Sequence, residues 1–126
     1  MSTDLTGILR QLIARGVSRL EHLELLLLLS RHSTTNWDAE RVAGSSVIPR
    51  PVAVDALAHL CKCELLEQAP GAAPTYHLGP RSELPLLVEL RTVYERDRIA
   101  VVNAFYACNL ESLRSFASAF RIRRPK

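Results

Sequence analysis

Residues 37–79, WDAERVAGSSVIPRPVAVDALAHLCKCELLEQAPGAAPTYHLG, contain the pattern that decides the fold. Asp38 is a favourable N-cap for a short helix, which the run Gly44-Ser45-Ser46 ends with a turn. Pro51 suits the first turn of a second helix, predicted over residues 52–64, because its missing N–H costs little there. The apolar stripe of this second helix is Ala53, Ala56, Leu57 and Leu60.

A β-hairpin is predicted directly after the second helix. Residues 65–68 indicate a first strand, the loop at 70–74 is rich in proline and glycine, and residues 75–78 form the returning strand. Gly79-Pro80 ends the hairpin. We expect Trp37 to pair with the hairpin as a short third strand.

Two helices are predicted before this stretch. Thr3 or Asp4 can cap a first helix that Gly16 ends. Ser18 and Glu21 have the spacing of a capping box for the next helix. The helix that follows Ser18 carries leucines around most of its circumference, so we predict that it is the most buried helix of the protein. The apolar stripe of the first helix is Leu5, Ile8, Leu9, Leu12 and Ile13. It can pack onto its own domain or onto a second copy of the chain, and we favour the second copy because the opposite face is polar.

Two more helices are predicted after the hairpin. A long helix runs from Ser82-Glu83 to about Ala107, and Asn109 caps a last helix. Arg91, Glu95 and Arg98 are spaced for ion pairs along one helix. The apolar stripe of the last helix is Leu110, Leu113, Phe116, Ala117 and Phe120.

The order of these elements is similar to that of the MarR-like transcriptional regulators. The resemblance covers nearly the whole chain, by layout more than by motif. It implies a mainly α fold with a small β-hairpin wing: one winged helix-turn-helix domain over residues 1–126, with additional N- and C-terminal helices. It also implies a homodimer built from residues 3–15 and 83–122, and a DNA-binding role. The expected dimer contacts are Leu5, Ile8, Leu9, Leu12, Leu113, Phe116 and Phe120.

Charge is distributed unevenly along the chain, whose formal net charge is +3. Residues 1–37 have four basic and three acidic side chains, residues 38–79 three and five, and residues 80–126 nine and five. The helix-turn-helix segment is therefore net −2, although DNA affinity depends largely on neutralised phosphates. If the module binds DNA, we expect contacts from Arg41, Ser45, Ser46, Arg50, Lys62 and Arg81, with the basic tail adding more.

A second hypothesis explains the same segment without DNA. Pro51, Val54, Asp55 and Ala58 lie opposite the predicted core stripe, and the hairpin tip has no charge. This face suits contact with a protein partner. The sequence therefore supports a DNA-binding transcriptional regulator, with a protein-interaction adaptor as the alternative.

Other classes of function find little support in the sequence. Phosphate-binding glycine loops, nucleophile elbows and helical zinc motifs are not found, so we predict neither an enzyme nor a cofactor. His59 and Cys63 could share a helix face, but without a second ligand pair no metal site is predicted. Tyr94 and Tyr106 could line a cavity, to which we assign no ligand. The three cysteines lack a disulfide spacing, and neither a signal peptide nor a membrane span is visible, which favours a cytoplasmic protein.

Overall fold

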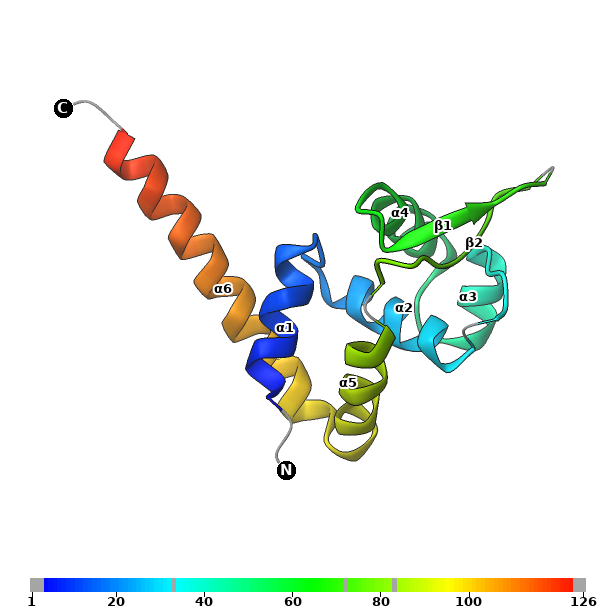
Figure 1. Cartoon of the computed structure of the whole chain (residues 1–126), viewed down its shortest axis with the longest axis horizontal. Coiled ribbons are helices and arrows are strands. Elements are labelled where there is room, and N and C mark those ends of the chain that lie inside the picture. The colour runs from blue at the N-terminus through cyan, green and yellow to red at the C-terminus, as the bar shows by residue number, and fades with distance from the viewer. Residues whose placement is uncertain (1–3, 33, 72, 83, 124–126) are drawn as a thin grey trace.

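The computed structural model describes residues 4–32, 34–71, 73–82 and 84–123. The fold is mainly helical, with one two-stranded antiparallel sheet (Figure 1). Among the described residues, no helix combines the length and the unbroken apolarity needed to cross a bilayer. The elements are α1 (Leu5–Ala14), α2 (Leu20–Arg31), α3 (Ala39–Ser45), α4 (Arg50–Lys62), β1 (Leu66–Ala69), β2 (Thr75–Leu78), α5 (Leu84–Arg96) and α6 (Arg98–Arg123).

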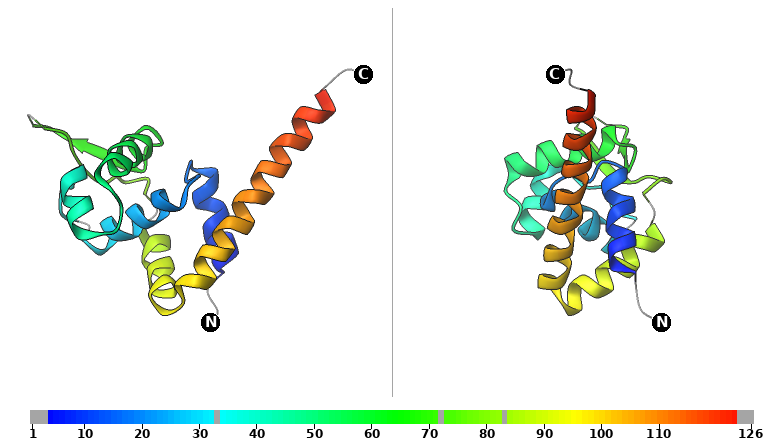
Figure 2. Two further views of the ribbon diagram at one scale, coloured as in Figure 1. Left: turned by 180° about the vertical axis from the view of Figure 1, so that it is seen from behind. Right: turned by 90° about the vertical axis from the view of Figure 1, so that its left-hand side faces the viewer.

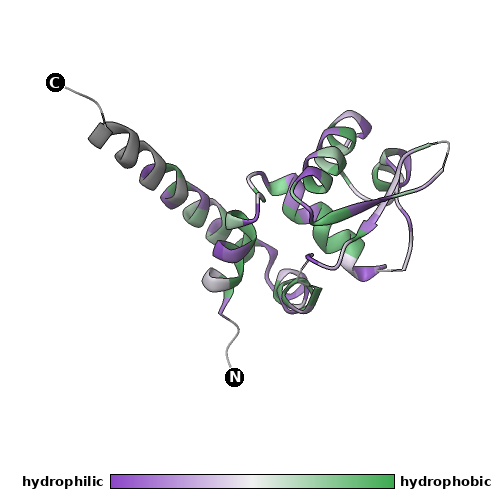
Figure 3. Ribbon diagram, turned by 45° about the horizontal axis from the view of Figure 1, so that its top comes forward, coloured by the Kyte–Doolittle hydropathy of each residue, from purple (hydrophilic) through white to green (hydrophobic). Residues whose placement is uncertain are grey.

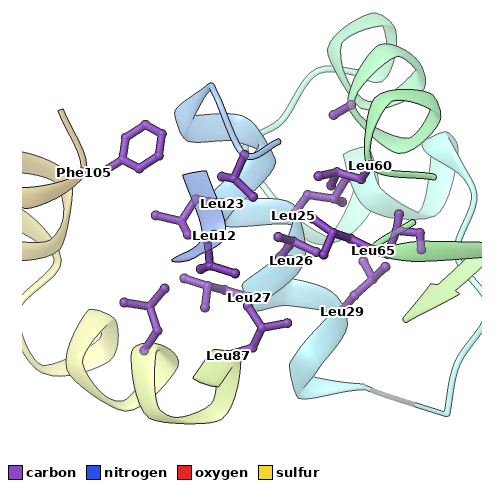
Figure 4. Packing of buried hydrophobic residues seen from close by; sticks show 14 of the residues in the cluster. Leu12, Leu23, Leu25, Leu26, Leu27, Leu29, Leu60, Leu65, Leu87 and Phe105 are labelled. Carbon is purple, nitrogen blue, oxygen red and sulfur yellow. The ribbon is translucent and has the colours of Figure 1, made fainter. Parts of the chain in front are cut away.

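The leucine-rich helix α2 is the centre of the core, as its sequence predicted. It packs against α4, α5 and β2, and leucines on several sides of it are buried (Figure 4). A helix that is apolar around most of its circumference requires cover on every side. The buried leucines of α2 are Leu23, Leu25, Leu26, Leu27 and Leu29.

The start of α2 differs from the predicted capping box. The helix begins at Leu20, and the buried ring of His22 reaches back to the chain before it. Its Nδ1 accepts hydrogen bonds from the backbone N–H groups of Ser18 and Arg19, at 3.3 Å each. The carboxylate of Glu21 lies 3.6 Å from the Arg19 guanidinium instead. The capping prediction was wrong because a buried imidazole satisfies the two N–H groups.

Helices α3 and α4 follow the predicted order with shifted ends. The side chain of Asp38 accepts a hydrogen bond from the Arg41 N–H at 2.8 Å, so the predicted cap is confirmed. Helix α3 continues through Gly44 to Ser45, and α4 begins at Arg50 rather than Val52. The predicted apolar stripe of α4 is fully buried, namely Ala53, Ala56, Leu57 and Leu60.

The hairpin has the predicted second strand at residues 75–78, and its first strand, Leu66–Ala69, begins one residue later than the predicted 65–68. Leu66 pairs with Leu78 and Ala69 with Thr75, which places the turn between residues 70 and 74. Trp37 and Tyr76 exchange two backbone hydrogen bonds of 2.7 Å. The predicted third strand is therefore confirmed, as a single bridge.

The long helix predicted after the hairpin is divided at Asp97. The side chain of Asp97 accepts a hydrogen bond from the Ala100 N–H at 3.1 Å and caps α6, which diverges from α5 (Figure 2). The predicted boundary at Asn109 was wrong, because α6 continues through it. Asn109 donates from its side chain to the Ser18 carbonyl at 3.1 Å.

The stripe on α1 is covered within one chain. Ile8, Leu9 and Leu12 are buried, and α1 packs against α6 and α5. The expectation that a second copy covers these residues is corrected, because α6 already does so. Leu5 is half-buried and Leu113 is exposed, whereas the side chains of the other two expected contacts, Phe116 and Phe120, lie outside the described residues.

We predict that Leu25→Ala lowers the free energy of unfolding by about 2–5 kcal/mol, because a fully buried leucine leaves a cavity in a packed core. Val47→Ala is the control, since Val47 is 87% exposed and its loss should change stability by less than about 0.5 kcal/mol. Urea denaturation measures both. Equal effects would contradict the assignment of α2 as the core helix.

Candidate nucleic-acid interface

Helix α4 presents one face to the core and the other to solvent. Opposite its buried stripe, the side chains of Pro51, Val54, Asp55, Ala58 and Lys62 are exposed. The β1–β2 hairpin lies beside this helix, because the chain turns sharply after it (Figure 1). Glu64 makes that turn in the left-handed region, with φ of 67°, and the Leu65 N–H bonds back to the Leu60 carbonyl at 3.0 Å.

Two exposed cations lie at the ends of α4, and a third lies on the neighbouring helix α3. Arg50 lies in the first turn of α4 and Lys62 in its last, about 18 Å apart at 1.5 Å per residue. The Arg41 guanidinium stacks over Trp37, 5.5 Å from the ring centroid, and donates to the Asn36 carbonyl. Among the described residues, no carboxylate forms an ion pair with any of the three. Their charges are therefore available to an anionic ligand.

Two other residues that were predicted to contact DNA, Arg81 and Ser46, bond to groups within the protein instead. Arg81 forms an ion pair with Glu64 at 2.9 Å, so a neighbouring carboxylate neutralises it. The Ser46 hydroxyl donates to the Val42 carbonyl at 2.8 Å and accepts from the Ile48 N–H at 3.2 Å. Ser45 is exposed. The structure thus leaves Arg41, Ser45, Arg50 and Lys62 open to a ligand.

Negative and neutral groups interrupt the positive surface. Asp55 is exposed in the middle of the outer face of α4. On the hairpin, the carboxylate of Glu67 lies 3.3 Å from His77. The described part of the hairpin tip has no charge, since it consists of Pro70, Gly71, Ala73 and Pro74. Attraction for an anion is therefore strongest at the two ends of α4 and at Arg41.

A second concave region lies where α2, α5 and α6 meet the turn between α3 and α4. This cavity of about 430 Å³ contains an ionic network that the sequence did not predict. Glu24 accepts hydrogen bonds from the Tyr94 hydroxyl at 2.6 Å and from Arg98 at 3.1 Å, and Arg98 also donates to the Tyr94 oxygen. Burial raises the pKa of Tyr94, and the hydrogen bond to Glu24 raises it further.

The ion pairs predicted along the helix after the hairpin were therefore wrong. Arg98 pairs with Glu24, Glu95 pairs with Arg31, and Arg91 donates to the Ser30 hydroxyl, so all three reach α2. Tyr94 lines the cavity, as expected. Tyr106 is 54% exposed and does not line it.

The fold also brings together two histidines that the sequence left apart. The rings of His22 and His59 stack, with centroids 4.4 Å apart and planes 13° from parallel. His59 Nε2 donates to the Gly16 carbonyl at 2.7 Å, and Cys63 Sγ lies 3.6 Å from the same nitrogen. Within the described ranges, no three histidine, cysteine or acidic side chains are placed to bind a metal ion. Sequence spacing gives no signal for this contact because the partners lie on different helices.

No model of a known protein family, no curated protein and no solved structure matches the chain. Its function is therefore inferred from the chemistry of its own surfaces.

We predict that stability falls as pH drops from 6.5 towards 4. Burial, and to a lesser extent the neighbouring His59, lower the pKa of His22 from 6.5 to about 4. The pKa of His22 is lower in the folded protein than in the unfolded chain, so the unfolded chain binds the proton first as the pH falls. The stability that is present above pH 6.5 is therefore lost as the pH drops from 6.5 to about 4. We expect a loss of about 2 kcal/mol between pH 7 and pH 4.5, measured by urea denaturation.

His22→Asn is the matched variant, because its side-chain oxygen can accept the same N–H groups without titrating. Its stability should change less over this window. An equally steep change would show that His22 is not the group responsible.

Proposed function

We propose that this chain is a winged helix-turn-helix protein that forms a homodimer and binds duplex DNA as a transcriptional regulator. One observation supports the proposal most: α4 projects an exposed face beside a hairpin, and a cation that forms no ion pair with any described residue lies at each of its ends. The element order supports it too, since α2, the Trp37 strand, α3, α4 and the β1–β2 hairpin follow one another as in winged-helix modules.

The dimensions of α4 suit the major groove. That groove is about 12 Å wide and admits one α-helix. Arg50 and Lys62, at opposite ends of the helix, would contact phosphates on the two sides of the groove. Arg41 would add a third phosphate contact from α3.

The outer face of α4 offers few groups for base recognition. Asp55 can accept a hydrogen bond from a cytosine amino group, and Val54 or Ala58 can contact a thymine methyl group. With three phosphate contacts and net charge −2 in residues 38–79, one module binds weakly. A dimer would present two modules to successive grooves, which is why dimerisation belongs to this proposal.

We predict weak, salt-sensitive binding to random duplex DNA, with a dissociation constant on the order of 10⁻⁴ M at about 200 mM salt and tighter binding at about 50 mM. Arg50→Ala combined with Lys62→Ala should lower the slope of log K against log salt by about 2 per module, because two phosphate contacts are lost. Fluorescence anisotropy measures both quantities.

Arg96→Ala is the matched control, since Arg96 is an exposed arginine at the end of α5, without an ion pair among the described residues. It should leave the slope unchanged. An equal effect of Arg96→Ala, or no binding at low salt, would contradict DNA contact through α4.

A second candidate function, an adaptor that binds protein, is favoured by a different observation. Val54 is 45% exposed between the exposed Pro51 and Ala58, and Glu64 neutralises Arg81 near the hairpin. An apolar patch of this kind suits a protein surface. Co-purification from the native cell distinguishes the two: a partner protein retained after nuclease treatment, and lost with Val54→Glu, would favour the adaptor.

A further inference from the structure

Helix α6 has two apolar faces, and one of them is uncovered. The face packed towards α1 and the core is buried, as Val101, Phe105 and Cys108 show. Because an α-helix has about 3.6 residues per turn, a second set of large apolar residues lies on the opposite side. That set is Ile99, Tyr106, Leu110 and Leu113, which are 70%, 54%, 50% and 59% exposed; we call it the outer α6 stripe.

The spacing of the outer α6 stripe matches that of paired helices. Ile99, Tyr106 and Leu113 are seven residues apart, and Leu110 divides the second interval into four and three. A seven-residue apolar repeat is the pattern with which two helices pack along their length. The stripe extends about 21 Å at 1.5 Å per residue, so it offers several turns of contact.

The charge of this segment restricts its occupant. Residues 99–110 contain no charged side chain on any side of the helix, and of the two charges that flank Leu113, Glu111 is paired with Arg10 and Arg114 lies just outside the stripe. A nucleic acid or an anionic lipid surface requires cations at the contact. An uncharged stripe can meet an identical stripe without repulsion, and a two-fold dimer places the same surface on both subunits.

The position of α6 leaves the outer stripe open to a second helix. The stripe lies on the side of α6 opposite the buried Val101, Phe105 and Cys108, along the stretch that packs on α1; after this contact the helix leads away from the body of the protein (Figures 1 and 2). Along the part of α6 that Figure 3 colours by hydropathy, hydrophobic residues alternate with hydrophilic ones. The stripe on α1 is by contrast already buried, so α6 carries the apolar surface that a second copy can reach.

We propose that the outer α6 stripe packs against the same stripe of a second copy of this chain, in a two-helix contact. The inference rests on the homodimer of the proposed function and assigns its contact surface. It replaces the expected contacts on α1 with Ile99, Tyr106 and Leu110, and it retains Leu113.

Tyr106→Glu combined with Leu110→Glu tests the assignment. Size-exclusion chromatography with light scattering should give twice the chain mass of 14.1 kDa for the unmodified protein and 14.1 kDa for the variant. The mass halves because like charges would be buried in the contact. Val47→Glu is the control, since it places the same acid on an apolar, 87% exposed residue that is not part of the outer α6 stripe, and it should remain dimeric.

A second variant and a second readout separate dimer loss from unfolding. Ile99→Glu combined with Leu113→Glu should also be monomeric, with the helical circular dichroism of the unmodified protein. A photo-crosslinking residue at position 106 should give a covalent dimer, whereas the same residue at position 47 should not.

Several results would overturn the proposal. The unmodified protein could be monomeric at every concentration tested, or a double-glutamate variant could stay dimeric. A monomer that co-sediments with anionic lipid vesicles would also contradict the proposal. Each is measured without DNA, so a failure to bind DNA would leave the dimer assignment standing.

Discussion

The need to bury α2 on every side determines how the other elements are placed. Its leucines occupy most of its circumference, so α4, α5 and the hairpin each cover part of it. Each covering helix can place one apolar stripe against α2, and its remaining face must then point outward. The outer face of α4, with Pro51, Val54 and Asp55, is exposed for this reason.

Charges in this protein serve two different purposes. Around α2, Glu24 and Arg31 fix α5 and the start of α6 through Tyr94, Arg98 and Glu95. Glu24 bonds residues on both sides of the break at Asp97, so this network holds the angle between α5 and α6. Around α4, by contrast, the three cations lack carboxylate partners among the described residues, and unpaired charge is what a charged ligand can recognise.

Local chemistry in the sequence was sufficient to predict the central elements. The Asp38 cap, the apolar stripe of α4 and the strand at residues 75–78 depend on neighbours in sequence, and each was found. The outward face of α4 followed from the same periodicity. What the sequence could not provide was any feature that depends on a distant partner.

The errors share that cause. The buried ring of His22 replaced the expected Ser18 cap, and Asp97 rather than Asn109 begins the last helix. Arg81 had the right charge for phosphate but lies beside Glu64, which the sequence separates from it. For the α1 stripe a second copy was favoured over the chain's own domain as the cover, because periodicity identifies an apolar face without identifying what covers it.

The proposed DNA binding requires that α4, which packs on α2 with its inner face, contacts the duplex with its outer face. An NMR titration of the isotope-labelled protein with a short duplex at low salt tests this directly. The amides of α3, α4 and the hairpin should shift, above all around Arg41, Arg50 and Lys62, and the shifts should disappear as salt is added. Shifts confined to α5 and α6, or no shifts in α4, would contradict it.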